Sequence, residues 1–146
     1  MLVDTIDGIN LKQTRNGILI FYDNSRKKWL SIFRESLSFG INNSNITGKR
    51  WLSTTGIVTN LNSYMLPRNG TIVSCTIQTK NVCNAKFSIR DKDNELFNIQ
   101  LNSQSGKTID DLNIDISNQD HIKVLLETVS GNVDYPIMCL EISWRN

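Results

Sequence analysis

Short runs of alternating apolar and polar residues follow one another along the chain, and a period of two predicts β-strands. In GTIVSCTIQT at residues 70–79, Val73, Cys75 and Ile77 alternate with small polar residues. The run at 136–144 alternates in the same way. No segment has the 3.6-residue period of an amphipathic helix. The pattern therefore predicts an all-β domain, built as a sandwich or a barrel.

Nine strands are predicted, separated by turns rich in Asn, Gly, Asp and Ser. They span 18–22, 29–33, 35–40, 70–79, 85–90, 95–101, 109–116, 121–129 and 136–144. The first two form a β-hairpin across DNSRKK. Turns between the later strands are expected at TKNVCN, DKDNE, NSQSGK, SNQD and SGNVDY. Residues 41–69 are rich in Asn, Ser, Thr and Gly, so we expect a long surface loop there.

The alternation also predicts the side chains that fill the core between two sheets. They are Val73, Ile77, Phe87, Ile89, Phe97, Ile99, Val124, Met138, Leu140 and Ile142. Leu125 breaks the alternation in IKVLLE, which indicates a second buried surface and predicts a homotrimer.

The domain organisation follows from where a core can form. Residues 35–146 are predicted to form the β-sandwich domain, and residues 1–34 an N-terminal attachment segment that contains the hairpin. Leu2, Val3, Ile6 and Ile9 have too few apolar neighbours for a core of their own, so we expect them to attach the protein to a partner. The alternative is a frayed terminus without a role.

Composition and charge narrow the class of protein. The 146 residues suffice for one domain that needs neither metal nor disulfide, and the net charge of +2 is spread along the chain. This balance argues against a nucleic-acid or membrane surface, and SRKK at 25–28 is interpreted as a solvated turn. We expect neither a signal peptide nor a membrane span. Cys75, Cys83 and Cys139 lack disulfide or metal spacing, which favours synthesis in a reducing cytoplasm.

The sequence contains few residues in patterns typical of a catalytic or metal site. His121 is the only histidine, which excludes His-based triads, and we expect it at the start of a strand. The carboxylates of RDKDNEL at 90–96 lack the glycine of a calcium loop, and those of TIDDLNIDIS at 108–117 are assigned to a turn and a strand. We therefore predict no enzyme, no catalytic or metal site and no cofactor.

Two aromatic residues of the 41–69 loop are candidates for ligand contact. Trp51 and Tyr64 have side chains that stack on sugars. The alternative for Trp51 is that it anchors the loop in an apolar pocket.

In GILIFYDNSRKKWLSIFRESLSFG, a Tyr-Asp strand end, a Ser-Arg-Lys turn and a Trp-Leu-Ser strand precede a hydrophobic-x-Phe-Gly element. This order of motifs is similar to a segment that recurs in surface proteins of tailed bacteriophages. WLSTTGIVTNLNSYMLPRNGTIVSCTIQT resembles the loop and Pro-containing turn of this family. IDDLNIDISNQDHIKVLLE and the closing MCLEISWRN resemble its last strands. The resemblance begins near residue 17, and the chain departs from it at Gln119, where the family has Gly before Asp120.

The resemblance implies a jelly-roll-like antiparallel β-sandwich, generally homotrimeric and displayed on a virion. On that basis we expect a structural protein of a bacteriophage virion surface, either a capsid decoration protein or a small fibre, made in the host bacterial cytoplasm. Its partners would be its own copies and other capsid, tail or fibre proteins. The alternative is the receptor-binding head of a fibre, which contacts a host glycan or protein.

Overall fold

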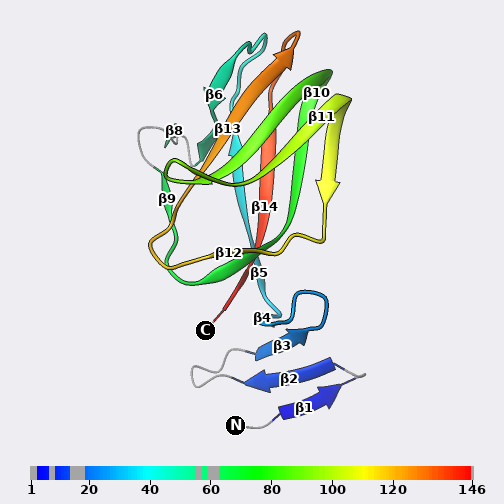
Figure 1. Ribbon diagram of the computed structural model, residues 1–146, viewed down its shortest axis with the longest axis vertical. Helices are drawn as coiled ribbons and strands as arrows, with labels where there is room; N and C mark the ends of the chain where they lie inside the picture. The colour runs from blue at the N-terminus through cyan, green and yellow to red at the C-terminus, as the bar shows by residue number, and fades with distance from the viewer. Residues whose placement is uncertain (1–2, 7–8, 14–18, 55–56, 59–62, 146) are drawn as a thin grey trace.

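The computed structural model describes residues 3–6, 9–13, 19–54, 57–58 and 63–145. These residues form strands in two antiparallel sheets, a small one at the N-terminal end and a large one that folds into a sandwich (Figure 1). The prediction of an all-β, jelly-roll-like sandwich preceded by a hairpin is confirmed. Within the described part of the chain, no helix has the length and apolar character needed to cross a membrane.

The small sheet is a four-stranded meander in the order β1-β2-β3-β4. Its strands are β1 (Val3–Ile6), β2 (Ile9–Gln13), β3 (Leu19–Asp23) and β4 (Lys28–Ser31). The β3–β4 pair is the predicted hairpin, with Tyr22 opposite Trp29. Of the predicted attachment residues, Val3, Ile6 and Ile9 lie in β1 and β2, which pair with each other. Leu2, and the side chains of the other three, lie outside the described part of the structure.

The large sheet is organised around one long strand. Its main strands are β5 (Arg34–Gly40), β10 (Gly70–Asp91), β11 (Asn94–Ile109), β12 (Ile114–Ile116), β13 (His121–Ser130) and β14 (Ile137–Trp144). The first part of β10 pairs with β14, which in turn pairs with β5. The last part of β10 pairs with β13. The strand β10 therefore belongs to both layers of the sandwich.

Two turns predicted from sequence are wrong. TKNVCN and NSQSGK do not end strands, because β10 and β11 remain paired on both sides of these segments. Between Gln78 and Cys83 the register shifts, since Gln78 lies opposite Gly106 while Cys83 lies opposite Gln104. The extra residues let β10 change direction at the end of the sandwich farthest from the N-terminal sheet (Figure 1). Polar turn residues here mark a bend within a strand.

The 41–69 segment is not the single loop that the sequence predicted. It contains β6 (Lys49–Trp51), β7 (Ser53–Thr54), β8 (Ile57–Val58) and β9 (Tyr64–Met65). Strands β6 and β9 extend the edge of β13, whereas β7 pairs with β5. The segment thus crosses from one layer to the other, and Leu52 at the crossing is fully buried. The isolated apolar residues of this polar segment are the sequence feature that indicates its packing along the edges of β13 and β5.

The predicted core is largely confirmed. Nine of the ten named side chains are buried, and the exception is Phe97, which is partly buried and packs against the core. Val73 occupies a β-bulge, because the β10–β14 register shifts between Ile72 and Ser74. Ile72 joins the central cluster, and Val73 is buried outside it. The strict alternation predicted for 73–77 therefore holds only after the bulge.

Two further details concern turns. The predicted strand 109–116 is interrupted, because β11 ends at Ile109 and β12 begins at Ile114. Gln119, where the bacteriophage family has Gly, adopts a positive φ of 70°. The turn therefore keeps the left-handed conformation that favours Gly, although a residue with a Cβ occupies it.

Truncating Phe87 tests the core. Its side chain is fully buried, so Phe87→Ala is expected to lower the free energy of unfolding by about 3–5 kcal/mol. Phe97→Ala removes the same atoms from a partly exposed position and should cost clearly less. Chemical denaturation measures both values, and equal losses would contradict the strand facing described here.

Candidate functional site

The turn between β3 and β4 is a compact hydrogen-bonded unit. The Asp23 carboxylate accepts bonds from the backbone N–H of Ser25 at 2.9 Å and of Arg26 at 3.0 Å, and from the Ser25 hydroxyl at 2.6 Å. Its second oxygen pairs with Arg26 Nη1 at 2.7 Å. A carboxylate that satisfies its own turn in this way is an Asx-type turn. Lys27 takes a positive φ of 56° at the tip.

Arg26 also joins this turn to the sandwich. Its Nε donates to the carbonyl of Leu112 at 2.6 Å, and Nη2 donates to the carbonyls of Val73 at 3.1 Å and Asp110 at 3.0 Å. The side chain is 11% exposed. One guanidinium therefore links the hairpin to the bulge of β10 and to the segment that follows β11, and its planar fork of donors suits this arrangement.

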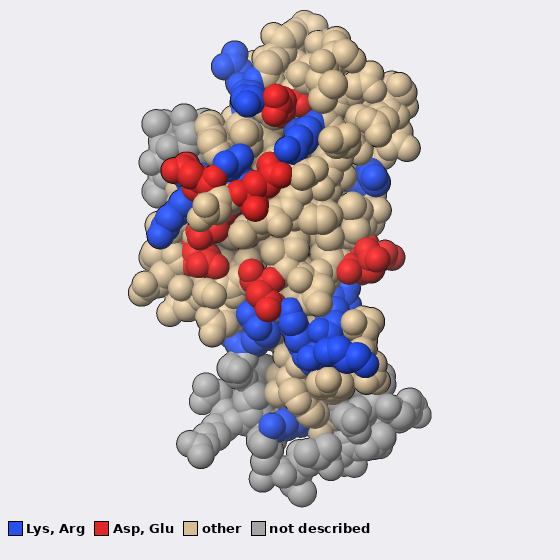
Figure 2. Space-filling view, viewed as in Figure 1, with Lys and Arg blue, Asp and Glu red and all other residues tan. Residues whose placement is uncertain are grey.

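A ring of charged and polar groups surrounds this junction. Lys28 pairs with Asp115, whose carboxylate also lies 3.5 Å from Arg145. The Ser143 hydroxyl donates to the carbonyl of Ser31 at 2.8 Å. Figure 2 shows Lys and Arg gathered where the sandwich meets the N-terminal region. The interpretation of SRKK as a solvated tip is therefore wrong, because Arg26 and Lys28 bond to the sandwich.

The electrostatics of the junction favour charged carboxylates. Burial alone raises the pKa of Asp23, but the bonds from Ser25 and Arg26 outweigh it and lower the pKa to about 2. Burial likewise raises the pKa of Asp115, while the bond from Lys28 and the charge of Arg145 lower it to below its ordinary value. Both carboxylates are thus ionised at neutral pH.

The two candidate ligand-contact residues lie along the same edge but face opposite ways. Trp51 lies opposite Leu125 of β13, with Lys123 Nζ 5.6 Å from the centre of its ring. Tyr64 lies opposite Ile122 and packs against the core. Because alternate residues of β13 face opposite sides, the structure does not bring Trp51 and Tyr64 into one site. A ligand role for either residue stays a prediction.

The residues that could have formed a catalytic or metal site instead make contacts that stabilise the fold. His121 begins β13 as predicted, and its Nδ1 lies 2.6 Å from the Ser63 hydroxyl. The Asp91 carboxylate accepts a bond from the His121 backbone N–H and not from its ring. Among the described residues, no group of three His, Cys, Asp or Glu side chains is placed to hold a metal ion.

The cysteines are free, as their spacing predicted. Burial raises the pKa of the Cys75 thiol to about 11, so it remains protonated at neutral pH.

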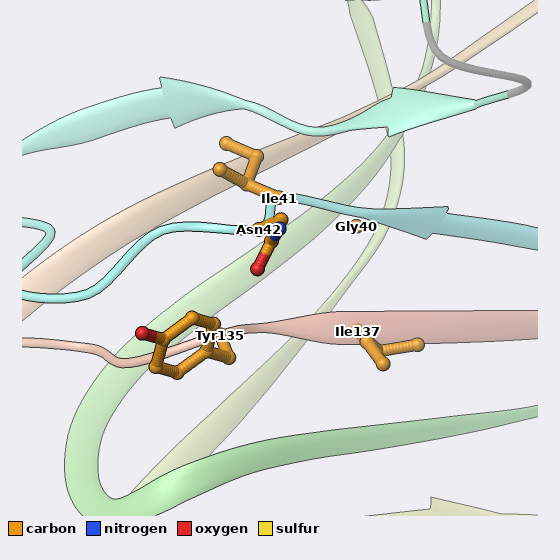
Figure 3. Close-up of a pocket in the computed structure, with 5 residues that line it drawn as sticks. All are labelled: Gly40, Ile41, Asn42, Tyr135 and Ile137. Atoms are coloured by element: carbon orange, nitrogen blue, oxygen red, sulfur yellow. The ribbon is translucent and has the colours of Figure 1, made fainter.

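A second exposed feature, which no sequence pattern predicted, lies at the opposite end of the sandwich. Tyr135, just before β14, is 40% exposed, and Ile137 beside it is 52% exposed. Together with Gly40, Ile41 and Asn42 they line a hollow of about 290 Å³ (Figure 3). The residues that line this hollow come from segments far apart in sequence. A Tyr-Pro pair in a turn also does not indicate whether the tyrosine ring is exposed or buried.

Comparison with known proteins bears on the fold. No protein-family model matches the chain, and no curated protein matches it. The structure of the PRD1 vertex protein P5 is similar with a TM-score of 0.51 and 12% identity, over 99% of this chain and 86% of that chain. That likeness shows a shared fold along nearly the full length of both.

Two further structures match less well. FLHE has a TM-score of 0.39 and 8% identity over 77% of this chain and 98% of that chain. The infectious bursal disease virus Gx strain has a TM-score of 0.39 and 10% identity over 99% and 45%. Neither carries an argument here.

Replacing Arg26 tests the junction. Arg26→Met removes the charge and all five N–H donors, leaving three sandwich carbonyls and Asp23 without this partner, and is expected to cost about 3 kcal/mol in the free energy of unfolding. The exposed neighbour Lys27 provides a matched control, because Lys27→Met removes the same charge. That change should stay within about 0.5 kcal/mol. Denaturation with limited proteolysis measures both, and equal stability of the two variants would contradict the role of Arg26.

Asp23 predicts how stability depends on pH. Because folding lowers its pKa from 3.8 to about 2, its contribution is present above about pH 4 and is lost as the pH falls towards 2. Asp23→Asn should therefore be less stable at pH 7 and show a shallower loss between pH 4 and pH 2. Thermal melts of the wild type and Asp23→Asn between pH 2 and pH 7 measure this difference. The control is Asp93→Asn, a change of an exposed turn residue. An unchanged slope in Asp23→Asn would refute the assignment.

Proposed function

We propose that this chain is a structural protein of a virus particle, held to the particle by its N-terminal sheet and displayed through its sandwich. The observation that carries the proposal is the fold shared with a phage vertex protein over nearly the whole of both chains. The bacteriophage resemblance of the sequence supports it independently, because it rests on local motifs and not on the fold.

The junction gives this role a physical basis. A displayed domain that is joined rigidly to its attachment segment keeps one orientation on the particle. The bonds of Arg26 to the carbonyls of Leu112, Val73 and Asp110 fix the hairpin against the base of the sandwich. The sandwich then extends away from the N-terminal sheet (Figure 1).

A location at few positions of the particle is favoured over a coat of many copies, because the similar protein is named for the vertex. The proposal is thus a small fibre or vertex component, and a capsid decoration protein is the second candidate. A receptor-binding head remains compatible with either location. No catalytic role is part of the proposal.

Copy number in the particle separates these roles. Quantitative mass spectrometry of purified particles that encode this chain, with immunogold labelling, should find tens of copies at discrete positions. Hundreds of copies spread over the shell would replace the vertex role with decoration. Absence from purified particles would overturn the proposal altogether.

Deleting residues 1–13 tests attachment. The deletion removes β1 and β2 but leaves the β3–β4 hairpin with its Arg26 contacts, so the remainder should fold and stay soluble. We expect it to be lost from particles. Val82→Ser, a change of an exposed residue in the distant bend of β10, provides the control that should still incorporate. Normal incorporation of the deletion variant would move attachment to the sandwich.

The predicted homotrimer is part of the same proposal. Leu125, from which it was inferred, is partly exposed on the outer face of β13 opposite Trp51. Sedimentation equilibrium at micromolar concentration should give three times the chain mass. A monomer would leave the virion role intact but remove self-association from it.

A further inference from the structure

Two adjacent hollows flank Tyr135 and Ile137 at the end of the sandwich away from the N-terminal sheet. The first, of about 290 Å³, is completed by Gly40, Ile41 and Asn42. The second, of about 320 Å³, is completed by Gln78, Thr79 and Lys80. Each is at the lower end of the range for ligand sites, and both open to solvent.

Tyr135 is held rigidly between the two hollows. Its φ of 48° lies in the left-handed region, which is costly for a bulky residue and persists only where the surroundings enforce it. Its N–H donates to the carbonyl of Asn43 at 2.7 Å. The preceding Asp134 donates its N–H to Asn81 Oδ1 at 2.8 Å and accepts a bond from the N–H of Lys80 at 2.9 Å. The backbone of this segment is thus clamped from both sides, which fixes the point from which the exposed ring of Tyr135 projects.

The polar groups around the ring are free to bind. Among the bonds of the described residues, none is made by the side-chain amides of Asn42 and Gln78, and both residues are exposed. Figure 3 shows the amide of Asn42 projecting towards Tyr135. On the other side, Lys80 Nζ lies 5.4 Å from the centre of the Tyr135 ring. The described residues that line the two hollows include no carboxylate.

We propose that this surface, the Tyr135 hollows, binds a saccharide that carries an acidic group. The C–H face of a sugar ring packs on an exposed, rigid aromatic ring, and Tyr135 with Ile137 supplies that apolar platform. Each amide offers both a donor and an acceptor, as sugar hydroxyls require. Lys80 supplies the charge that selects an acidic sugar over a neutral one, and no lining carboxylate opposes it.

This site differs from the one that the sequence suggested. Trp51 also has a lysine over its ring, but it lies on the outer face of β6 and β13. Trp51 is therefore the matched control for an aromatic residue beside a lysine. The proposal does not depend on the virion role, because binding is a property of the purified protein.

The test titrates the purified full chain with neutral oligosaccharides of glucose, galactose and N-acetylglucosamine and with acidic ones containing glucuronic or N-acetylneuraminic acid. Saturation-transfer NMR and calorimetry should detect an acidic oligosaccharide. Tyr135→Ala should weaken its binding at least tenfold. Lys80→Gln should reduce it to the level of the neutral sugars, and Trp51→Ala should leave it unchanged.

Two results would overturn the proposal. The first is no binding of any probe at millimolar concentration. The second is equal saccharide binding by Tyr135→Ala and wild type, and if this variant also lost self-association, the surface would be a subunit contact. Thermal melts confirm that each variant folds. If Tyr135→Ala does not fold, Asn42→Ala and Lys80→Gln test the same surface, and unchanged acidic-sugar binding in both would refute it.

Discussion

The guanidinium of Arg26 is the interaction on which the arrangement of the two sheets depends. It neutralises the nearly buried Asp23 inside its own turn and at the same time donates to three carbonyls of the sandwich. The Val73 carbonyl at the bulge also accepts the Leu112 N–H at 3.0 Å, so Arg26 is its second donor. The carbonyls of Leu112 and Asp110 belong to the irregular segment after β11. Arg26 therefore joins the sandwich to the hairpin through backbone groups of both β10 and this segment. The surrounding pairs formed by Lys28 and Arg145 with Asp115 are more exposed, and they add less because water screens them.

The outer surfaces of the two layers differ in chemistry. Over β13 and the last part of β10, long charged side chains pair with one another, as Lys86 does with Glu95 and Lys49 with Glu127. Over β5, β14 and the first part of β10, small residues such as Ser38 and Cys139 face outward beside the ion pair of Arg34 with Glu141. A surface that carries many ion pairs is suited to contact with water. Small side chains allow the surface of another protein to approach the sheet closely. The fold thus presents two faces of unequal character.

Much of the fold could be predicted from period-two alternation, because a sandwich strand has one buried and one solvated face. Alternation fails where the backbone departs from a regular ladder. The bulge at Val73 and the bend between Gln78 and Cys83 are examples, since polar residues suit an edge bend as well as a turn. The candidate sites were less predictable. Nothing local distinguishes Arg26 from a solvated arginine, because its acceptors in the sandwich come from segments more than forty residues away. Tyr135 is held at the surface by its own bond to Asn43 and by the bond of the neighbouring Asp134 to Asn81.

The position of β14 has a consequence for how the chain acquires its structure. This strand lies between β5 and the first part of β10, so two segments that are synthesised early gain their shared neighbour only when residues 137–144 are present. The layer that contains β5 and the first part of β10 cannot be completed until residues 137–144 join it. Folding is therefore dominated by contacts between distant parts of the chain, which places it among slow, high-contact-order folders. Until then the apolar faces of β5 and β10 lack this partner, and unpaired strands with exposed apolar faces are prone to aggregation.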